Sequence, residues 1–269
     1  MSAYPYLISS FPDFRQIGQT AVLNEWVECI RRNLRPADRE AAECIFQRYD
    51  LLNLYHALLR SQWGIQTPQH RGQVSLPGEE LLPSSGQIDT RPEFIQQFFL
   101  KHGKRLDQLN PFEMAQALFQ SFNDHAEKCC PMELNDLFVL EENLRMSVQY
   151  YHAQRHPENA NQLDVPKDIQ WLKPGNQPSE ALEKEYPGLI NLWKSLEESK
   201  LWSQDDLLQE IVIQRAFSLA SAQPYGSMHV FANCFVLLAA YRKAEIMETD
   251  ESPLEYHLEA LLQPISLSI

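Results

Sequence analysis

The sequence predicts an all-α protein of about eight to ten helices, and three observations support this class. Apolar residues recur at steps of three and four over long stretches, which is the spacing of one face of a helix. Glycine is scarce, with only 9 among 269 residues, whereas β-folds and glycine-rich phosphate loops depend on it. Strand-like and helix-like segments do not alternate, so no parallel sheet is expected.

The beginning of the chain predicts an extended segment followed by two helices. Residues 3–14 contain two prolines and alternate loosely, which is typical of a short edge strand or an extended arm. Residues 19–34 have apolar side chains at helical spacing. After a break at residues 35–38, residues 40–62 form the central predicted helix, in which no Gly or Pro occurs before Gly64.

The predicted helix at 40–62 has an apolar face and a polar face. The apolar face carries Ile45, Tyr49, Leu52, Tyr55 and Leu59, and the polar face carries Asp50, Asn53, Ala57 and Arg60. The polar face has two interpretations. One is an ordinary solvated surface, and the other is a polar seam between helices in which Asp and Arg pair and Asn fixes the register.

Start signals divide the rest of the chain into further helices. Asn110, Pro111 and Glu113 provide a cap, a first-turn proline and an acid that can reach back to the cap. Further helices are expected at 132–155, 187–201 and 229–247. The helices at 40–62, 132–155 and 229–247 each carry acid, amide and arginine groups on one side, which leaves open a pseudo-threefold repeat of helical lobes. Arg242 and Glu245 in the last of these have the same two interpretations as Asp50 and Arg60.

Loops rich in Pro, Gly, Gln and Ser suggest a multi-lobed organisation. The predicted parts are an N-terminal helical lobe at 1–66, a loop excursion at 67–92, a middle helical lobe with a long loop at 93–178, and a C-terminal helical lobe at 179–269.

Charge and cysteine content restrict the partners and the compartment. The net charge of −13 argues against nucleic acid and against an anionic membrane surface, because both attract clustered Lys and Arg. The five cysteines are odd in number and form no C-x-x-C pair, so we expect free thiols in a reducing cytoplasm. The longest apolar run, at 228–241, is shorter than the roughly 20 residues that span a bilayer, so no membrane insertion is expected.

The sequence contains no motif that predicts catalysis. G-x-S-x-G, the P-loop and G-x-G-x-x-G are absent, which removes support for acyl transfer, nucleotide hydrolysis and dinucleotide chemistry. Glu141 and Glu142 are paired acids, but a solvated helix face is the favoured interpretation of them. We therefore expect no catalytic residue, no small-molecule substrate and no cofactor.

Two groups of residues have spacings that a metal site could use. His152 and His156 lie four residues apart near a predicted helix end, where basic groups are also favoured by the helix dipole. His125, Cys129 and Cys130 form a looser cluster. Adjacent cysteines rarely bind one zinc ion, so a helix boundary is the favoured interpretation of this cluster. No metal ligand is predicted, and a metal-dependent helical enzyme using the two histidines stays a lesser hypothesis.

Three segments carry a resemblance to known families. The start, YPYLISSFP, is similar to a bacterial family of unassigned function whose members often begin YYYLVASLP. YDLLNLYHALLRSQWG resembles the signature of the C-type subunit of V/A-type ATPases, which is the d-type subunit in eukaryotes. VFANCFVLLAAYRKAEIM resembles the late Tyr-x₃-Glu segment of the same family. The matching positions are Asp50, Asn53, Leu54, Leu59, Arg60, Tyr241 and Glu245.

The resemblance implies a non-catalytic coupling subunit that seats the central shaft of a rotary ATPase on its membrane rotor ring. Members of that family are all-helical proteins of three similar lobes, and this chain is shorter and matches their middle repeat poorly. The implied partners are the central-stalk and proteolipid-ring subunits, in the cytoplasm at the periphery of the inner membrane. Candidate structural or interface residues are Asp50, Asn53, Arg60, Tyr241, Arg242 and Glu245. The alternative is a helical adaptor or regulator unrelated to a rotor.

Overall fold

The protein is described from a computed structural model, and its described part consists of helices and the segments that join them. The described residues are 4–11, 20–64, 82, 91–155, 166–198, 204–223 and 225–248. Within these ranges there are ten α-helices, two 3-10 helices and no β-strand, so the all-α prediction is confirmed. The loop excursion at 67–92 lies almost entirely outside the described residues.

The α-helices are, in chain order, α1 (Pro5–Ser10), α2 (Thr20–Asn33), α3 (Pro36–Trp63), α5 (Glu93–His102), α6 (Pro111–Cys129), α7 (Met132–Arg155), α9 (Glu180–Glu185), α10 (Leu189–Glu197), α11 (Gln204–Ala220) and α12 (Ser227–Glu248). The 3-10 helices are η2 (Gly103–Gln108) and η3 (Lys167–Ile169).

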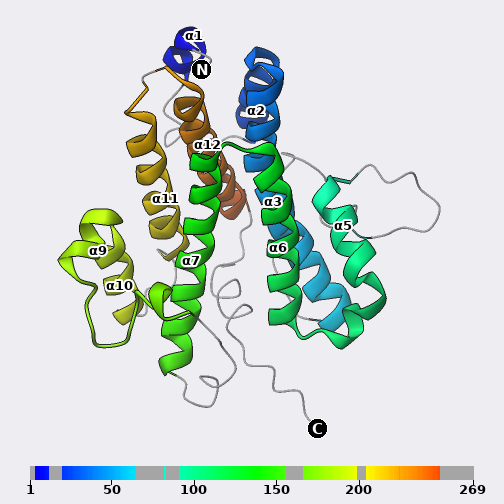
Figure 1. Ribbon diagram of the computed structural model, residues 1–269, viewed down its shortest axis with the longest axis vertical. Coiled ribbons are helices and arrows are strands. Elements are labelled where there is room, and N and C mark those ends of the chain that lie inside the picture. Colours follow the sequence, from blue (N-terminus) through cyan, green and yellow to red (C-terminus); the bar gives the residue numbers. More distant parts are fainter. Residues whose placement is uncertain are drawn as a thin grey trace.

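The long helices run roughly along the length of the molecule, and the short ones lie at its edges. Helix α12 packs against α11, α3 and α2, and α3 packs in turn against α6. Helix α5 covers α6 at one edge, while α9 and α10 lie at the opposite edge beside α11 (Figure 1). Each of the three predicted lobes therefore contributes helices to one packed body.

A row of phenylalanine rings connects these helices through the core. Phe94 of α5 meets Phe122 of α6 edge-on, with ring centroids 5.3 Å apart, and Phe122 meets Phe138 of α7 at 5.2 Å. Phe138 then approaches Phe235 of α12 at 6.1 Å. Such edge-to-face pairs stabilise a core by about 0.5–1.5 kcal/mol each beyond their buried area. Buried side chains from Tyr4 to Ala240 belong to the same cluster, whereas the pseudo-threefold repeat stays a prediction.

Helix α3 is longer than its apolar pattern predicts. The expected break at 35–38 exists but is shorter and lies at Leu34 and Arg35, because the helix begins at Pro36. A proline is well suited to the first turn of a helix, where its missing N–H leaves no bond unmade. The helix ends at Gly64, whose φ of 63° is left-handed and is therefore favourable for glycine.

The beginning of the chain is helical rather than extended, so the predicted edge strand or arm is wrong. Pro5 opens α1, and Tyr4 fastens this helix to two distant parts of the chain. The Tyr4 N–H donates to the Tyr225 carbonyl oxygen at 2.7 Å, just before α12. The Tyr4 hydroxyl donates to Asp38 and accepts from the Arg35 N–H at the start of α3.

None of the helices in the described ranges combines the length and the apolar composition that crossing a bilayer requires.

Candidate functional site

Two of the polar residues predicted on α3 lie in the interior. Asp50 and Asn53 are only 1% and 2% exposed, so the solvated-surface interpretation is wrong for both. Among the described residues, Asp50 Oδ1 and both polar atoms of the Asn53 amide find no hydrogen-bond partner. Burial raises the pKa of the Asp50 carboxyl well above its usual value, although Arg31 opposes this shift.

The remaining predicted interface residues do not join Asp50. Arg60 is half-buried at the last turn of α3. Ten residues of helix place it about 15 Å along the axis from Asp50, so these two cannot form the predicted pair. Tyr241, Arg242 and Glu245 belong to α12, but their side chains lie outside the described part of the structure.

A polar seam between helices does exist, and its centre is Glu141 of α7. Glu141 is 2% exposed, so its interpretation as a solvated acid is wrong. Its Oε2 accepts from Nε of Arg48 of α3 at 3.3 Å, and its Oε1 accepts from Arg145 at 2.9 Å. The side-chain amide of Gln209 of α11 donates to the same Oε1 at 3.2 Å. These four residues, which we call the Glu141 cluster, connect three helices.

A fourth helix, α6, contributes aromatic rings to the surroundings of the Glu141 cluster. The Arg48 guanidinium carbon lies 4.7 Å from the ring centroid of Phe119 and 5.2 Å from that of Phe122, both on α6. Within the described residues its two Nη atoms make no hydrogen bond, and the two rings add a cation–π contact to the ion pair with Glu141. Burial lowers the pKa of Arg48, and the Glu141 carboxylate opposes that shift.

A signal for the Glu141 cluster is present in the sequence. Arg48 is three residues after Ile45 and four before Leu52, so it interrupts the apolar face of α3. Glu141 likewise follows Leu137 by four and precedes Leu144 by three. Charged residues inside an apolar stripe are candidates for buried pairing.

A second, partly buried group combines sulfur and imidazole donors between α3 and α6. Cys44 is buried on α3, and His125 and Cys129 lie on α6. One donor atom from each residue lies within 4.8 Å of the others, and Cys129 Sγ is 4.0 Å from His125 Nδ1 and 3.9 Å from Nε2. We call these three residues the Cys44 cluster. The sequence groups His125 and Cys129 with Cys130, and a helix boundary is the favoured interpretation of them. It gives no indication of Cys44, which the packing of α3 on α6 brings beside them.

The environment of the Cys44 cluster keeps its thiols protonated. The neighbouring Cys130 sulfur and burial together raise the pKa of Cys44 well above its usual value. Burial, together with the nearby Cys44 thiol and the Glu40 carboxylate, raises the pKa of Cys129 to about 11. The Cys44 thiol also raises the pKa of His125, against the effect of burial. An ion that binds here would have to displace thiol protons.

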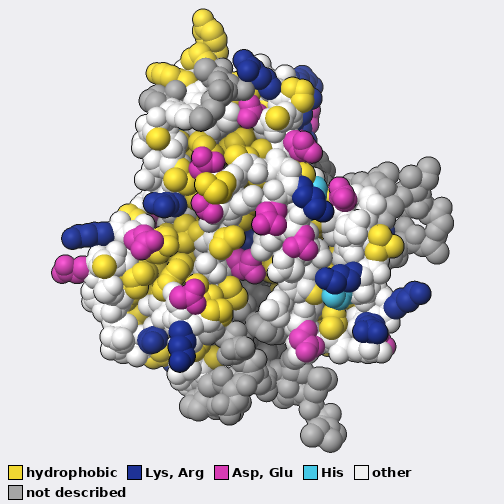
Figure 2. Space-filling model, in the orientation of Figure 1, with side chains coloured by type: hydrophobic (Ala, Val, Ile, Leu, Met, Phe, Trp, Pro, Cys, Tyr) yellow, Lys and Arg dark blue, Asp and Glu magenta, His cyan; other side chains and the backbone are white. Residues whose placement is uncertain are grey.

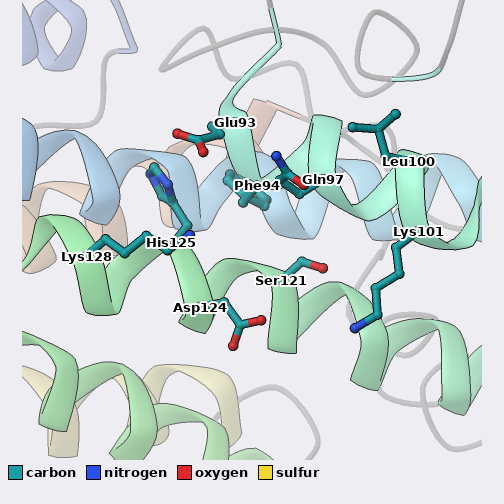
Figure 3. A pocket seen from close by; sticks show the side chains of 9 residues that line it. All are labelled: Glu93, Phe94, Gln97, Leu100, Lys101, Ser121, Asp124, His125 and Lys128. Carbon is teal, nitrogen blue, oxygen red and sulfur yellow. The ribbon is translucent and has the colours of Figure 1, made fainter.

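A pocket of about 420 Å³ opens beside the Cys44 cluster, between α5 and α6. Its lining comprises Glu93, Phe94, Gln97, Leu100, Lys101, Ser121, Asp124, His125 and Lys128. Glu93 and His125 lie close together at one end, and Lys101 reaches in from the other end (Figure 3). His125 therefore belongs both to the pocket wall and to the Cys44 cluster.

The histidine pair at the end of α7 is only partly described. His152 Nε2 lies 3.4 Å from the Gln204 side-chain oxygen at the start of α11. His156 lies outside the described residues, so a metal role for this pair stays untested.

Comparison of the chain with protein-family models, with curated proteins and with solved structures gives no match.

Proposed function

We propose that this protein is a non-catalytic coupling subunit of a V/A-type rotary ATPase, which seats the central shaft on the membrane rotor ring. The observation that carries the proposal is the placement of the two segments that resemble this ATPase family. YDLLNLYHALLRSQWG forms the second half of α3 and its Gly64 cap, and VFANCFVLLAAYRKAEIM forms most of α12. These two helices are far apart in the sequence but pack against each other.

Rigid packing supports a mechanical role. A subunit that transmits torque must turn as one piece, and its helices must not slide past one another under load. The Glu141 cluster ties α3, α7 and α11 together through charge-assisted hydrogen bonds. The row of phenylalanine rings connects α5, α6, α7 and α12.

The surface supports protein partners. On the face shown in Figure 2, hydrophobic side chains are visible among Lys, Arg, Asp and Glu, most densely left of centre. Tyr6 is 89% exposed, and Tyr225 is 51% exposed at the neighbouring start of α12. Exposed tyrosines are typical anchors of protein interfaces, and the net charge of −13 favours a basic counterpart. In this proposal the protein works in the cytoplasm, at the periphery of the inner membrane, and is held there by its partners.

Affinity purification of the tagged full-length chain from its native cells tests the proposal. We expect shaft and ring subunits of a rotary ATPase to be recovered together with it after mild detergent extraction. The salt concentration is kept low, because salt screens the ion pairs that contribute to binding between the subunits. Recovery of neither kind of subunit would contradict the proposal. A defined set of other partners would instead favour the helical adaptor or regulator unrelated to a rotor.

A further inference from the structure

The Cys44 cluster has the donor set of a site for a thiophilic metal ion. Two cysteine sulfurs and one imidazole nitrogen are ligands that zinc prefers over oxygen-rich sets, and calcium and magnesium prefer the opposite. The three donors come from two packed helices, with Cys44 on α3 and His125 and Cys129 on α6. They therefore belong to regular elements that already hold them together.

The spacing of the donors is close to what zinc requires. With Zn–S of about 2.3 Å and Zn–N of about 2.0–2.1 Å, tetrahedral geometry places ligand atoms about 3.5–3.8 Å apart. The Cys129 sulfur is 3.9 Å from His125 Nε2, and all three donor atoms lie within 4.8 Å of one another. Contraction by about 1 Å or less, within reach of side-chain rotation, would bring them to coordinating distance.

Helix geometry explains why these residues converge. His125 and Cys129 are four residues apart on α6, so both project from the same side of that helix. This side faces α3, which packs closely on α6, and Cys44 lies on the buried side of α3. The aromatic ring of Phe94 lies against the His125 ring, with centroids 6.1 Å apart, and restricts how far the imidazole can turn.

We propose that Cys44, His125 and Cys129 bind one zinc ion, with the fourth position left to a water molecule or another small ligand. Binding converts two thiols to thiolates and releases two protons, while the neutral imidazole donates a nitrogen lone pair. The divalent charge offsets the two thiolates in this buried place. Cys130 is not assigned as a ligand, because adjacent cysteines rarely share one ion and its sulfur falls outside the group of three.

The matched set of cysteine variants makes this assignment testable. The full-length chain is purified through a tag that contains no histidine, from cells supplied with zinc, and zinc per chain is measured by mass spectrometry after dialysis. We expect about one zinc per chain in the unaltered protein and in Cys29→Ser and Cys130→Ser. In Cys129→Ser and His125→Asn we expect zinc per chain to fall far below one, since losing a ligand weakens zinc binding by more than the roughly 10–100-fold effect of losing the ligand's outer support.

Cobalt substitution reports the ligands directly. Co²⁺ bound to the unaltered chain should give thiolate charge-transfer absorption and the strong visible bands of a tetrahedral site, and both should be lost in Cys129→Ser. Circular dichroism of each variant checks that the helices are intact, so that a loss of metal is not a loss of fold. Because the measurement is metal content, its result is independent of whether rotary ATPase subunits bind the chain.

Several outcomes would overturn the assignment. Zinc far below one per chain would show that these residues do not hold zinc. Zinc held equally by the unaltered chain and by Cys129→Ser would show an adventitious ion only. A loss of zinc in Cys130→Ser as large as that in Cys129→Ser would refute the three-ligand site. Intact-protein mass reduced by two hydrogens, with no zinc, would show a disulfide in place of a metal.

Discussion

Asp50 shows how a single buried side chain can make stability depend on pH. Its carboxyl is 1% exposed, and burial raises its pKa in the folded state. A raised folded pKa means that the unfolded chain loses the proton first as pH rises. Asp50 therefore lowers the free energy of unfolding as pH rises above its unfolded pKa of about 3.9. The decrease continues until the folded carboxyl also ionises.

Asp50→Asn should remove this pH dependence, because an amide of nearly the same shape does not ionise. We expect the variant to gain stability relative to the unaltered protein at pH 8, and to gain less at pH 5. Urea denaturation at both pH values measures the difference. The same gain at both pH values would show that Asp50 does not ionise differently on unfolding. Glu113→Gln is unsuitable as a control because it alters a cap, whereas the exposed Asp107→Asn is matched.

Arg48 and Glu141 should be strongly coupled in stability. Glu141→Leu leaves the guanidinium groups of Arg48 and Arg145 without their shared carboxylate, and breaking such a buried pair costs about 3–5 kcal/mol. Arg48→Met should cost less, because Glu141 keeps its bonds to Arg145 and Gln209. The double variant should be more stable than Glu141→Leu alone, because it also removes the Arg48 guanidinium that Glu141→Leu leaves without its carboxylate. The Arg145 side chain is 19% exposed and can turn to water.

A double-mutant cycle in urea measures this coupling, and the ion pair of Arg31 with Glu43 supplies the comparison. Both side chains of that pair are 30% exposed, so its disruption by Glu43→Gln, which leaves the Arg31 pair with Glu28 in place, should cost less than about 1 kcal/mol. Equal costs for Glu43→Gln and Glu141→Leu would contradict the special role of burial in the Glu141 cluster.

Helix boundaries follow closely from local chemistry. The predicted capping box before α6 is confirmed, since Asn110 Oδ1 accepts from the Glu113 N–H and Glu113 Oε2 accepts from the Asn110 N–H, each at 2.9 Å. Pro36 and Gly64 likewise delimit α3. These signals depend on a few neighbouring residues, so a sequence contains them in full.

Removal of the α6 cap should destabilise the protein by the free energy that one capping interaction contributes. Asn110→Ala is expected to lower the free energy of unfolding by about 0.5–2 kcal/mol. Asn110→Asp keeps an oxygen acceptor and adds a negative charge at the helix N-terminus, so it should cost much less. Thermal and urea unfolding of both variants checks this order, and equal losses would contradict the capping role.

Contacts between elements are harder to predict than the elements themselves. The all-α class and most helices follow from periodicity, but the partner of each polar residue depends on which helices pack. Asp50 and Arg60 share one helix face without meeting, whereas Arg48 meets Glu141 across two helices. Cys44 is on α3 and His125 is on α6, far apart in the sequence, yet they lie beside each other in space. Spacing within one segment can indicate that a charged residue such as Arg48 is buried, but it does not show which residue of another helix it meets.

The exposed end formed by α1 and the start of α12 is the surface on which we expect a partner to bind. Tyr6→Ala should weaken binding of the co-purified partner at least tenfold, or about 1.4 kcal/mol, with little change in stability, because the side chain is 89% exposed. Leu100→Ala is the control, since Leu100 is also highly exposed, at 79%, but lies on α5 at another edge. Equal weakening of binding by both substitutions would show that the partner does not bind specifically at α1.

The tether at Tyr4 has a consequence for the order of synthesis. The first described residue, Tyr4, is held by Tyr225, which a ribosome makes only after the helices from α1 to α11. Helix α12, also among the late products, packs against α2 and α3, which are among the earliest. The early helices of the nascent chain therefore stay uncovered until α12 has been made, and a ribosome that stalls before α12 leaves behind an unfinished interior for chaperones to shield.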